Sequence, residues 1–342
     1  MQFAGSHIIS VDQFERADIE AIFAVADRME PYAHRRKITR VLDGAILGSM
    51  FFEPSTRTRV SFGCAFNLLG GHVRETTGFE HSAIAKGESL YDTARVISGY
   101  SDIITMRHPE PGSVTEFANA SRVPVLNGGD GSNEHPSQAL LDLYTIKLEM
   151  QGRGGGIDRI RIALIGDLRF GRTVHSLCKL LSLYRDIDVL LISPPELKMP
   201  GEIVATMREA GHSVTETENL AAHIGNVDIA YSTRLQEERF GSQEDADRYR
   251  GRFRLNHHFY TQHCDPNTVI MHPLPRDSRA VANELDNDLN DNPNLAIFRQ
   301  ADNGVLVRMA LFAMVLEVVD QIDNDSRGVN WYTGSRFQKP AP

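Results

Sequence analysis

The chain has 342 residues, and its 45 acidic residues outnumber its 36 lysines and arginines, which gives a formal net charge of −9. A chain of this length predicts about two domains, each able to bury a core of its own. The acidic balance argues against a general nucleic-acid binder or a binder of anionic membranes, since both usually carry a basic surplus. Taken alone, it also disfavours a small anionic substrate, an expectation that the motifs reverse.

Cysteine usage and hydropathy indicate the compartment. Cys64, Cys178 and Cys264 are far apart and form no C-x-x-C pair, which fits a reducing environment and disfavours a disulfide framework or a zinc site. The first residues lack the basic and apolar segments of a signal peptide. The apolar run 309–316 is far shorter than the roughly 20 residues of a membrane span. We therefore expect a cytoplasmic protein with no membrane partner.

Apolar runs alternate with helical periodicity along the chain, which predicts βα units on parallel sheets. The first half is expected to contain helix 11–29, strand 45–52, helix 60–69, helix 88–100, strand 102–106, helix 114–120, strand 123–126 and helix 136–150. The second half is expected to contain strand 160–165, helix 173–183, strand 189–192, helix 202–210, a strand near Val214, strand 228–232 and strand 269–271. The predicted fold class is α/β, with two doubly wound parallel-sheet domains and helices on both faces of each sheet.

Domain boundaries follow from composition. The stretch 151–156 (Q-G-R-G-G-G) is the best candidate linker, which gives a first domain at 1–150 and a second at 151–297. A strongly apolar helix follows at about 298–325 without a new strand, so we expect it to pack back on the first domain. The polar tail 326–342 is expected to be flexible.

Hydroxyl and cationic side chains gather at Ser55-Thr56-Arg57-Thr58-Arg59, between a predicted strand and a predicted helix. The free N–H groups and the dipole of a helix start attract an anion, and Arg57 can donate two N–H bonds to a phosphate. Ordinary capping by Ser55 or Thr56, with solvated arginines, is the alternative.

A second helix start carries His135-Pro136-Ser137-Gln138, with proline at a position that suits the first turn. His135 and Gln138 are three residues apart and therefore face one side of the helix, where they can bind a carbonyl oxygen and an amide. A capping histidine beside an exposed glutamine is the alternative.

The stretch Gly166–Thr173 also joins a strand to a helix, but its glycine spacing departs from the G-x-G-x-x-G pattern of dinucleotide sites. This disfavours a nicotinamide dehydrogenase, and Arg172 is instead suited to a carboxylate. Two further segments, 233–236 and 271–276, follow strands at the edge where open α/β sheets bind ligands. A polar loop at 82–86 carries one lysine.

Taken in chain order, these motifs resemble those of the transcarbamoylase family. The likeness rests on S-T-R-T-R, Met106-Arg107-His108-Pro109, H-P-S-Q, G-R-T-V-H-S-L at 171–177 and His272-Pro273-Leu274-Pro275, and it runs from about residue 5 to about residue 320. Thr233-Arg234-Leu235-Gln236 and H-P-L-P resemble the aspartate branch, whereas the ornithine branch carries H-C-L-P and an S-M-G motif that we do not find. The tail after about residue 320 departs from the family pattern.

The resemblance implies that carbamoyl phosphate and L-aspartate form N-carbamoyl-L-aspartate and phosphate, an early step of pyrimidine synthesis, without a cofactor or a metal. The implied catalytic residues are Arg57, Thr58, Lys86, Arg107 and His135. The implied carbamoyl-phosphate ligands are Ser55, Thr56, Arg57, Thr58, Arg107, His135, Gln138, Pro273, Leu274 and Pro275. The implied aspartate ligands are Lys86, Arg172, Arg234 and Gln236.

The resemblance also implies an assembly and a motion. The expected assembly is a homotrimer in which Ser82 and Lys86 reach into the site of a neighbouring subunit, and a separate regulatory chain is left open. Domain closure would pair Glu53 with Arg172 and Arg239, for which an ordinary surface ion pair is the alternative. No nucleic-acid partner is expected.

Physical chemistry agrees with these roles. Both substrates are anions that repel each other, and Arg57, Lys86, Arg107, Arg172 and Arg234 bring five cations to them. Attack by the amine creates a negatively charged oxygen, which Thr58, Arg107 and His135 would stabilise as hydrogen-bond donors. The departing phosphate is a suitable proton acceptor, so no residue is predicted as the only base. A site is set by local charge, and the net charge of −9 therefore does not exclude it.

Two other interpretations remain. A transcarbamoylase for another amine, such as ornithine, is disfavoured because Arg234 and Gln236 suit a dicarboxylate acceptor. A non-catalytic paralogue that acts in assembly or regulation is disfavoured because Arg57, Lys86 and Arg107 are all present.

Overall fold

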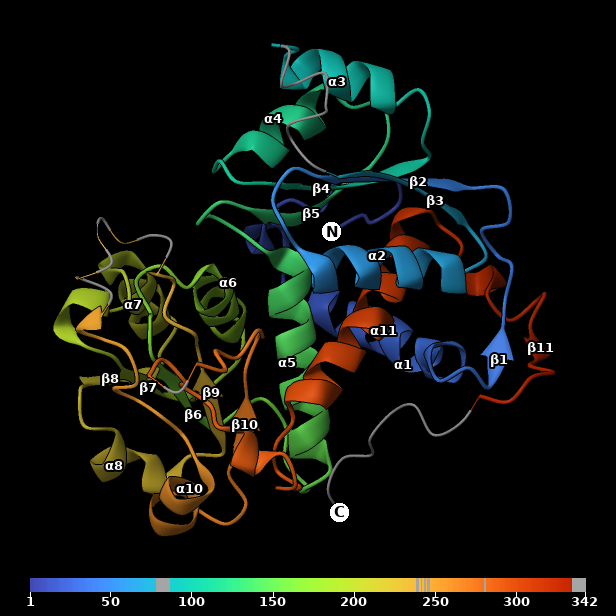
Figure 1. The fold of residues 1–342 in the computed structure, drawn as a ribbon. Coiled ribbons are helices and arrows are strands. Elements are labelled where there is room, and N and C mark those ends of the chain that lie inside the picture. The colour runs from blue at the N-terminus through green and yellow to red at the C-terminus, as the bar shows by residue number, and fades with distance from the viewer. Residues whose placement is uncertain are drawn as a thin grey trace. The chain divides into compact units, whose positions relative to one another are not determined.

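The chain forms two compact units in the computed structural model, which describes residues 1–77, 87–237, 240, 242, 244, 247–279 and 281–333 (Figure 1). Unit 1 contains Met1–Leu140 and the described residues from Asp302 onward, and unit 2 contains the described residues of Leu141–Ala301. Each unit has its own parallel sheet with helices on both faces, so the predicted α/β class is confirmed.

Unit 1 is built on a four-stranded parallel sheet in the order β3-β2-β4-β5. Its strands are β2 (Ile46–Phe51), β3 (His72–Thr77), β4 (Ile103–His108) and β5 (Val125–Asp130). The apolar runs predicted β2, β4 and β5, and all residues of β4 and β5 are buried. The sequence pattern missed β3, because this edge strand reads H-V-R-E-T-T and has no apolar run.

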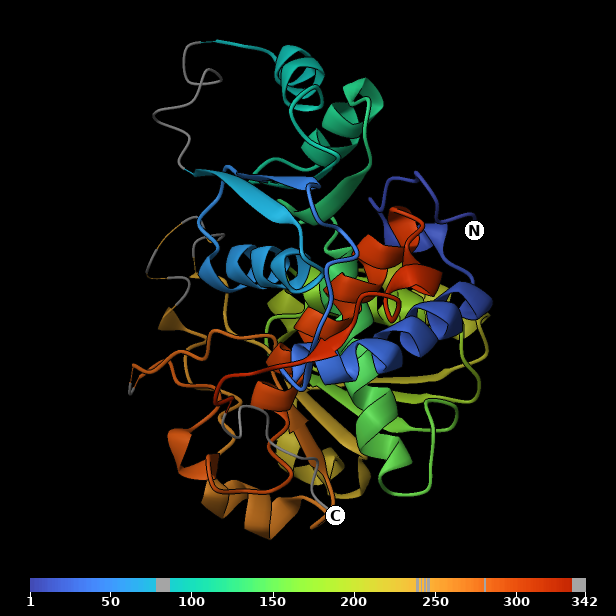
Figure 2. The same ribbon diagram turned by 90° about the vertical axis from the view of Figure 1, so that its right-hand side faces the viewer.

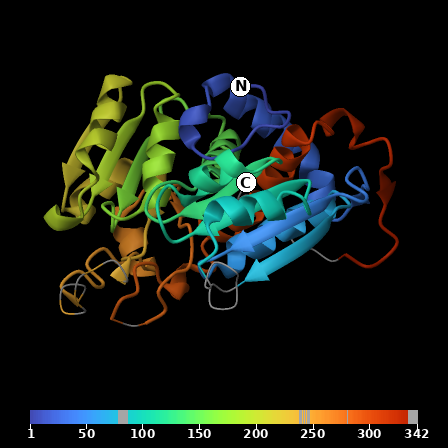
Figure 3. The ribbon, with the colours of Figure 1, turned by 90° about the horizontal axis from the view of Figure 1, so that it is seen from above.

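Helices cover both faces of this sheet. On one face lie α3 (Leu90–Ile97) and α4 (Ser113–Ala120), in front of the sheet in Figure 3, with a core that includes Met50, Met106 and Phe117. On the other face lie α1 (Arg16–Ala33), α2 (Thr56–Leu68) and the part of α11 (Ile297–Val315) that belongs to unit 1 (Figure 2).

The C-terminal helix packs back on unit 1, as the sequence predicted. Phe312 of α11 makes edge-to-face contacts with Phe62 and Phe66 of α2, at ring-centre distances of 5.9 and 5.0 Å, and all three side chains are fully buried. Arg308 Nη1 donates to Ser61 Oγ at 2.8 Å. Such aromatic pairs contribute about 0.5–1.5 kcal/mol beyond the area that they bury.

Part of the C-terminal tail is also ordered against unit 1. Strand β11 (Arg327–Gly328) pairs with β1 (Lys37–Ile38) in an antiparallel two-stranded sheet. The Tyr32 hydroxyl donates to Asp323 Oδ1 at 2.6 Å. The first described residues of the tail, which we expected to be flexible, therefore contribute to the fold of unit 1.

Unit 2 has a five-stranded parallel sheet in the order β10-β9-β6-β7-β8. Its strands are β6 (Arg161–Ile165), β7 (Asp188–Ile192), β8 (Ser213–Thr217), β9 (Ile229–Ser232) and β10 (Val269–Met271). Its own helices are α6 (Arg172–Leu181), α7 (Gly201–Glu209), α8 (Leu220–His223) and α10 (His257–His263), with α6 and α7 on one face and α8 and α10 on the other (Figure 1). The strand order reverses direction between β6 and β9, and such a reversal places a ligand crevice at the carboxyl ends of those strands.

Two helix starts and the passage of the chain between the units differ from the sequence prediction. Helix α2 begins at Thr56, so the S-T-R-T-R motif forms its first turn. Helix α1 begins at Arg16, and the residues before it form a separate 3-10 turn, Val11–Gln13. The glycine-rich stretch 151–156 follows α5 (Pro136–Gln151) inside unit 2. The chain passes between the units within α5 and within α11.

Candidate active site

The first turn of α2 is an open helix N-terminus with no acidic residue. Ser55 occupies the capping position, but its side chain makes no hydrogen bond to the helix, so its hydroxyl is not used for capping. Arg57 lies on this turn, where partial burial and then the charge of Arg107 hold its guanidinium pKa below the usual value. The cations of Arg57 and Arg107 beside the start of this helix form an environment that attracts a phosphate.

Arg107 is the next-to-last residue of β4 and therefore lies at the carboxyl end of the sheet, as the start of α2 does. Its side chain is 11% exposed, and its Nη2 donates to Glu53 Oε1 at 3.0 Å. Its Nη1 also lies 3.4 Å from the carbonyl oxygen of Gly128. The Glu53–Arg107 ion pair arises because Phe51 of β2 is in register with Arg107 of β4, and Glu53 follows Phe51 by two residues. Sequence analysis assigned Glu53 only to domain closure and missed this partner.

His135 is buried at the start of α5 and is held there by the loop that precedes it. The fully buried Asp130 accepts hydrogen bonds from the backbone N–H groups of Glu134, at 2.9 Å, and Gly112, at 3.0 Å. Asn127 Nδ2 lies 3.2 Å from the same carboxylate. Asp130 thus fixes the turn between β5 and α5, a role that no spacing rule in the sequence indicates.

The carbamoyl-phosphate residues predicted in the first half of the chain therefore gather at the carboxyl ends of the strands of the unit 1 sheet. Residues 55–58 follow β2, Arg107 lies within the carboxyl end of β4, and His135 follows β5. Gln138 lies one turn into α5, with its backbone N–H donating to the carbonyl oxygen of His135 at 3.0 Å.

In unit 2, the glycines of the stretch Gly166–Thr173 have a steric explanation. Gly166 has a φ of +111°, and a Cβ there would lie 2.6 Å from the carbonyl oxygen of Thr233. A Cβ on Gly171 would lie 2.7 Å from the carbonyl oxygen of Asp167. The two glycines thus let this loop lie against the end of β9 and fold closely before α6, which begins at the buried Arg172.

The segment Thr233–Gln236 is tied to this loop by side-chain hydrogen bonds. Thr233 Oγ1 donates to the carbonyl oxygen of Ile165 at 2.9 Å. The side-chain amide of Gln236 donates to the carbonyl oxygen of Phe170 at 2.6 Å. Arg234 Nη1 donates to the carbonyl oxygen of Leu235 at 3.1 Å. The structure therefore places Arg234 and Gln236 on a segment that contacts the loop directly before Arg172, the first residue of α6.

The H-P-L-P turn follows β10 and is organised by its histidine. His272 Nδ1 accepts the backbone N–H of Leu274 at 2.8 Å, so the proton lies on Nε2, which donates to Glu284 Oε1 at 2.8 Å. Burial holds the His272 pKa below its usual value despite the neighbouring carboxylate. The peptide bond between Leu274 and Pro275 is cis.

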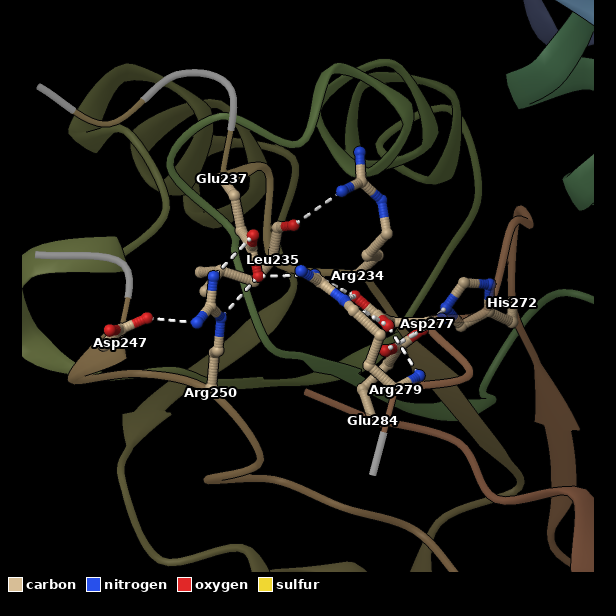
Figure 4. A network of polar contacts seen from close by, with 9 residues as sticks. All are labelled: Arg234, Leu235, Glu237, Asp247, Arg250, His272, Asp277, Arg279 and Glu284. Atoms are coloured by element: carbon tan, nitrogen blue, oxygen red, sulfur yellow. Dashed lines mark hydrogen bonds and ion pairs between the residues drawn. The ribbon is translucent and has the colours of Figure 1, made fainter. Parts of the chain in front are cut away.

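Charged side chains from three loops form a network beside these segments (Figure 4). Glu237 accepts hydrogen bonds from Arg250 and Arg279, and Arg250 foremost lowers the Glu237 pKa to about 2. Asp247 pairs with Arg250, and Asp277 pairs with Arg279. Sequence analysis missed this network, because its members have no characteristic spacing.

A pocket opens at the carboxyl ends of β6, β7 and β9. Asp167, Thr233, Leu235, Arg252 and Glu284 contribute to its lining. Arg234 and Gln236 are not lining residues, although the segment that carries them forms one wall.

Three predicted site residues, Ser82, Lys86 and Arg239, lie outside the described residues. Glu53 belongs to unit 1 and Arg172 to unit 2, so their proposed pairing stays a prediction.

Two family models match the chain. The carbamoyl-phosphate-binding domain of aspartate/ornithine carbamoyltransferases matches residues 6–148, and the aspartate/ornithine-binding domain matches residues 158–315. The chain belongs to the aspartate/ornithine carbamoyltransferase family. The resemblance inferred from the motifs is thereby confirmed.

Members of this carbamoyltransferase family resemble the chain over nearly its full length. The aspartate carbamoyltransferase catalytic subunit of Saccharophagus degradans is 73% identical and covers 98% of this chain and 100% of its own. The corresponding subunit of Cellvibrio japonicus is 70% identical, with 98% and 99% covered. The crystal structure of aspartate transcarbamoylase from Trypanosoma cruzi with carbamoyl phosphate and aspartate is 37% identical, has a TM-score of 0.84, and covers 92% of this chain and 98% of its own.

Within the described part of this family member, no three His, Cys, Asp or Glu side chains cluster as metal ligands would. The helices described here also lack the long apolar stretch that crossing a membrane requires.

Proposed function

We propose that this chain transfers the carbamoyl group of carbamoyl phosphate to the amine of L-aspartate, giving N-carbamoyl-L-aspartate and phosphate for pyrimidine biosynthesis. The observation that carries the proposal is the 73% identity, over 98% of this chain and 100% of the relative, to an aspartate carbamoyltransferase catalytic subunit. Arginines beyond the carboxyl ends of both sheets support it, because Arg57 and Arg107 in unit 1 and Arg172 and Arg234 in unit 2 suit two anionic substrates.

Unit 1 provides the proposed phosphate and oxyanion contacts. The start of α2 presents hydroxyl and N–H groups from Ser55, Thr56 and Thr58. Arg57 adds a guanidinium group that can donate two hydrogen bonds to the phosphate. Thr58, Arg107 and His135 stabilise the oxygen that becomes negative when the amine attacks the carbamoyl carbon. Removing one such donor typically raises the barrier by about 2.7–4 kcal/mol.

Unit 2 provides the proposed aspartate contacts. Arg172, Arg234 and Gln236 hold the two carboxylates, which requires the amide of Gln236 to exchange or share its bond to Phe170. The carbamoyl amide is bound by Gln138 and by backbone carbonyls of the turn formed by Pro273, Leu274 and Pro275. The leaving phosphate accepts the proton, and catalysis then rests on orientation and charge stabilisation.

We further propose a homotrimer in the cytoplasm, with Ser82 and Lys86 entering a neighbouring site and with Glu53, Arg172 and Arg239 acting in domain closure. The proposed division assigns carbamoyl phosphate to residues 1–150 with the helix at about 298–325, and aspartate to 151–297. The three free cysteines favour a reducing compartment.

A transfer assay tests the reaction. Purified protein is incubated with carbamoyl phosphate and with L-aspartate, with L-ornithine or with no acceptor, and the carbamoylated product is measured. We expect turnover with aspartate alone. Turnover with ornithine alone would overturn the acceptor assignment, and a folded protein inactive with every amine would favour the non-catalytic interpretation.

A further inference from the structure

Glu237 directly follows the segment that carries Arg234 and Gln236, and its carboxylate joins that segment to two other loops (Figure 4). Its Oε1 accepts hydrogen bonds from Arg250 Nε and from Arg279 Nη2, each at 2.7 Å. Its Oε2 accepts one from Arg250 Nη2 at 2.8 Å. One carboxylate therefore takes three charge-assisted hydrogen bonds from two guanidinium groups.

From Arg279 the network continues toward the H-P-L-P turn. Arg279 Nε donates to Asp277 Oδ1 at 3.0 Å, and the backbone N–H of Asp277 donates to Glu284 Oε1 at 3.1 Å. Glu284 in turn accepts a hydrogen bond from His272 Nε2, and His272 Nδ1 accepts one from the backbone N–H of Leu274. A continuous path of hydrogen bonds thus connects Glu237 to the turn that follows β10.

We propose that Glu237 is a positioning residue that holds the segment carrying Arg234 and Gln236 in register with the H-P-L-P turn. The inference rests on the proposed function, in which that segment meets aspartate and the turn meets the carbamoyl amide. Glu237 then orients the attacking amine toward the carbamoyl carbon without touching either substrate.

The contacts of Glu237 with Arg250 and Arg279, called the Glu237 bridge below, differ in geometry from an ordinary surface ion pair, which contributes little to stability. The side chains of Glu237 and Arg250 are each only 15% exposed, and both oxygens of the carboxylate are used. Arg279, which carries the path toward the H-P-L-P turn, is 51% exposed and contributes direction more than buried charge. Because the Glu237 pKa is about 2, the bridge stays ionised across the neutral pH range. Orientation is expected to be its main contribution, because a misplacement of about 1 Å costs roughly 100-fold in rate.

The test compares Glu237→Gln with Asp188→Asn. The control makes the same change from carboxylate to amide in the Arg161–Asp188 pair, whose atoms lie 2.9 Å apart at the amino ends of β6 and β7. For Glu237→Gln we expect the KM for aspartate to rise by about tenfold or more, with an intermediate rise in Glu237→Asp. The Kd for carbamoyl phosphate without aspartate should stay within about twofold, and Asp188→Asn should match the wild type.

An unchanged KM for aspartate in Glu237→Gln would overturn the inference while leaving the proposed function intact. An equal loss of affinity for both substrates would also overturn it, because that result indicates general damage to the fold. If the wild type carbamoylates no aspartate, the proposed function fails, and hydrogen exchange still tests the bridge. The backbone amides of residues 233–236 should then exchange faster in Glu237→Gln than in Asp188→Asn, and equal exchange would contradict the bridge.

Discussion

Glu53 and Arg107 form an ion pair across the carboxyl ends of β2 and β4, with Oε1 and Nη2 3.0 Å apart. Burial lowers the Arg57 pKa first, and the charge of the nearby Arg107 lowers it further. The negative Glu53 offsets part of the repulsion between the two arginines, which lets both cations face one anion.

Replacing Glu53 with glutamine separates positioning from charge. The amide holds Arg107 less firmly, because a hydrogen bond between charged groups contributes more than one to a neutral amide. We expect kcat to fall by roughly 10- to 100-fold, as for a misplaced catalytic group. Removing a negative charge should leave the binding of inorganic phosphate unchanged or tighter, as calorimetry would show. The matched control is Glu75→Gln, which breaks the Arg59–Glu75 pair of 3.1 Å in the same unit. Wild-type kcat in Glu53→Gln would refute the positioning role.

The proposed sharing of sites between subunits predicts complementation. Lys86→Gln and Arg57→Ala chains should each be nearly inactive, because each lacks one cation of every site. In mixed trimers, some sites combine a wild-type Lys86 from one chain with a wild-type Arg57 from another. Activity should therefore reappear after the two variants are dissociated and reassembled together. Mixed trimers, verified by mass spectrometry, that stay inactive would count against shared sites.

Asp302, near the start of α11, gives the stability of the protein a defined pH dependence. Burial raises its pKa from 3.8 to about 6, so the folded state binds its proton more tightly than the unfolded state does. The contribution of Asp302 to stability is therefore present below about pH 4 and is lost as the pH rises through 6. Asp302→Asn should stabilise the protein at pH 8 by about 1–2 kcal/mol, since one pKa unit corresponds to about 1.4 kcal/mol and the side chain is not fully buried.

Thermal or urea unfolding at pH 4 and pH 8 measures this effect. The gain should vanish at pH 4, and the exposed Asp291→Asn serves as the control. A gain of equal size at both pH values would contradict the assignment to Asp302 ionisation.

The buried pair of Glu149 and Arg299 predicts a large loss of stability for a single change. Arg299 Nε and Nη2 donate to the two oxygens of Glu149 at 2.7 and 3.2 Å, and both side chains are less than one tenth exposed. Glu149→Gln leaves a buried cation without its counter-charge, which typically costs about 3–5 kcal/mol. The double change Glu149→Leu with Arg299→Met should recover most of this loss in urea unfolding. If Glu149→Gln is as stable as the wild type, the Glu149–Arg299 pair does not contribute measurably to the free energy of unfolding.

The sequence predicted the parts of the fold and site that depend on local patterns. Apolar runs located β2, β4 and β6, and S-T-R-T-R lies at the start of a helix that follows a strand, as expected. The family resemblance, carried by short motifs in order, was confirmed by the two family models.

What the sequence did not reveal depends on tertiary contacts. Strand β3 is at the edge of its sheet, where polar side chains are tolerated, so it has no apolar run. The Glu53–Arg107 pair follows from the register of two strands, and the bridge at Glu237 joins three loops. The residues of these two contacts stand at no fixed sequence spacing, so a single sequence does not indicate either contact.

The discontinuity of unit 1 has a consequence for its synthesis. The described residues of unit 2 lie between Leu140 and Asp302 in the chain, so the ribosome makes all of them before Phe312 is added. At roughly 5–20 residues per second, Phe312 of α11 is added on the order of 10 to 50 s after its aromatic partners Phe62 and Phe66. The second unit is therefore complete before the first, which reverses the usual order in which domains mature from the N-terminus.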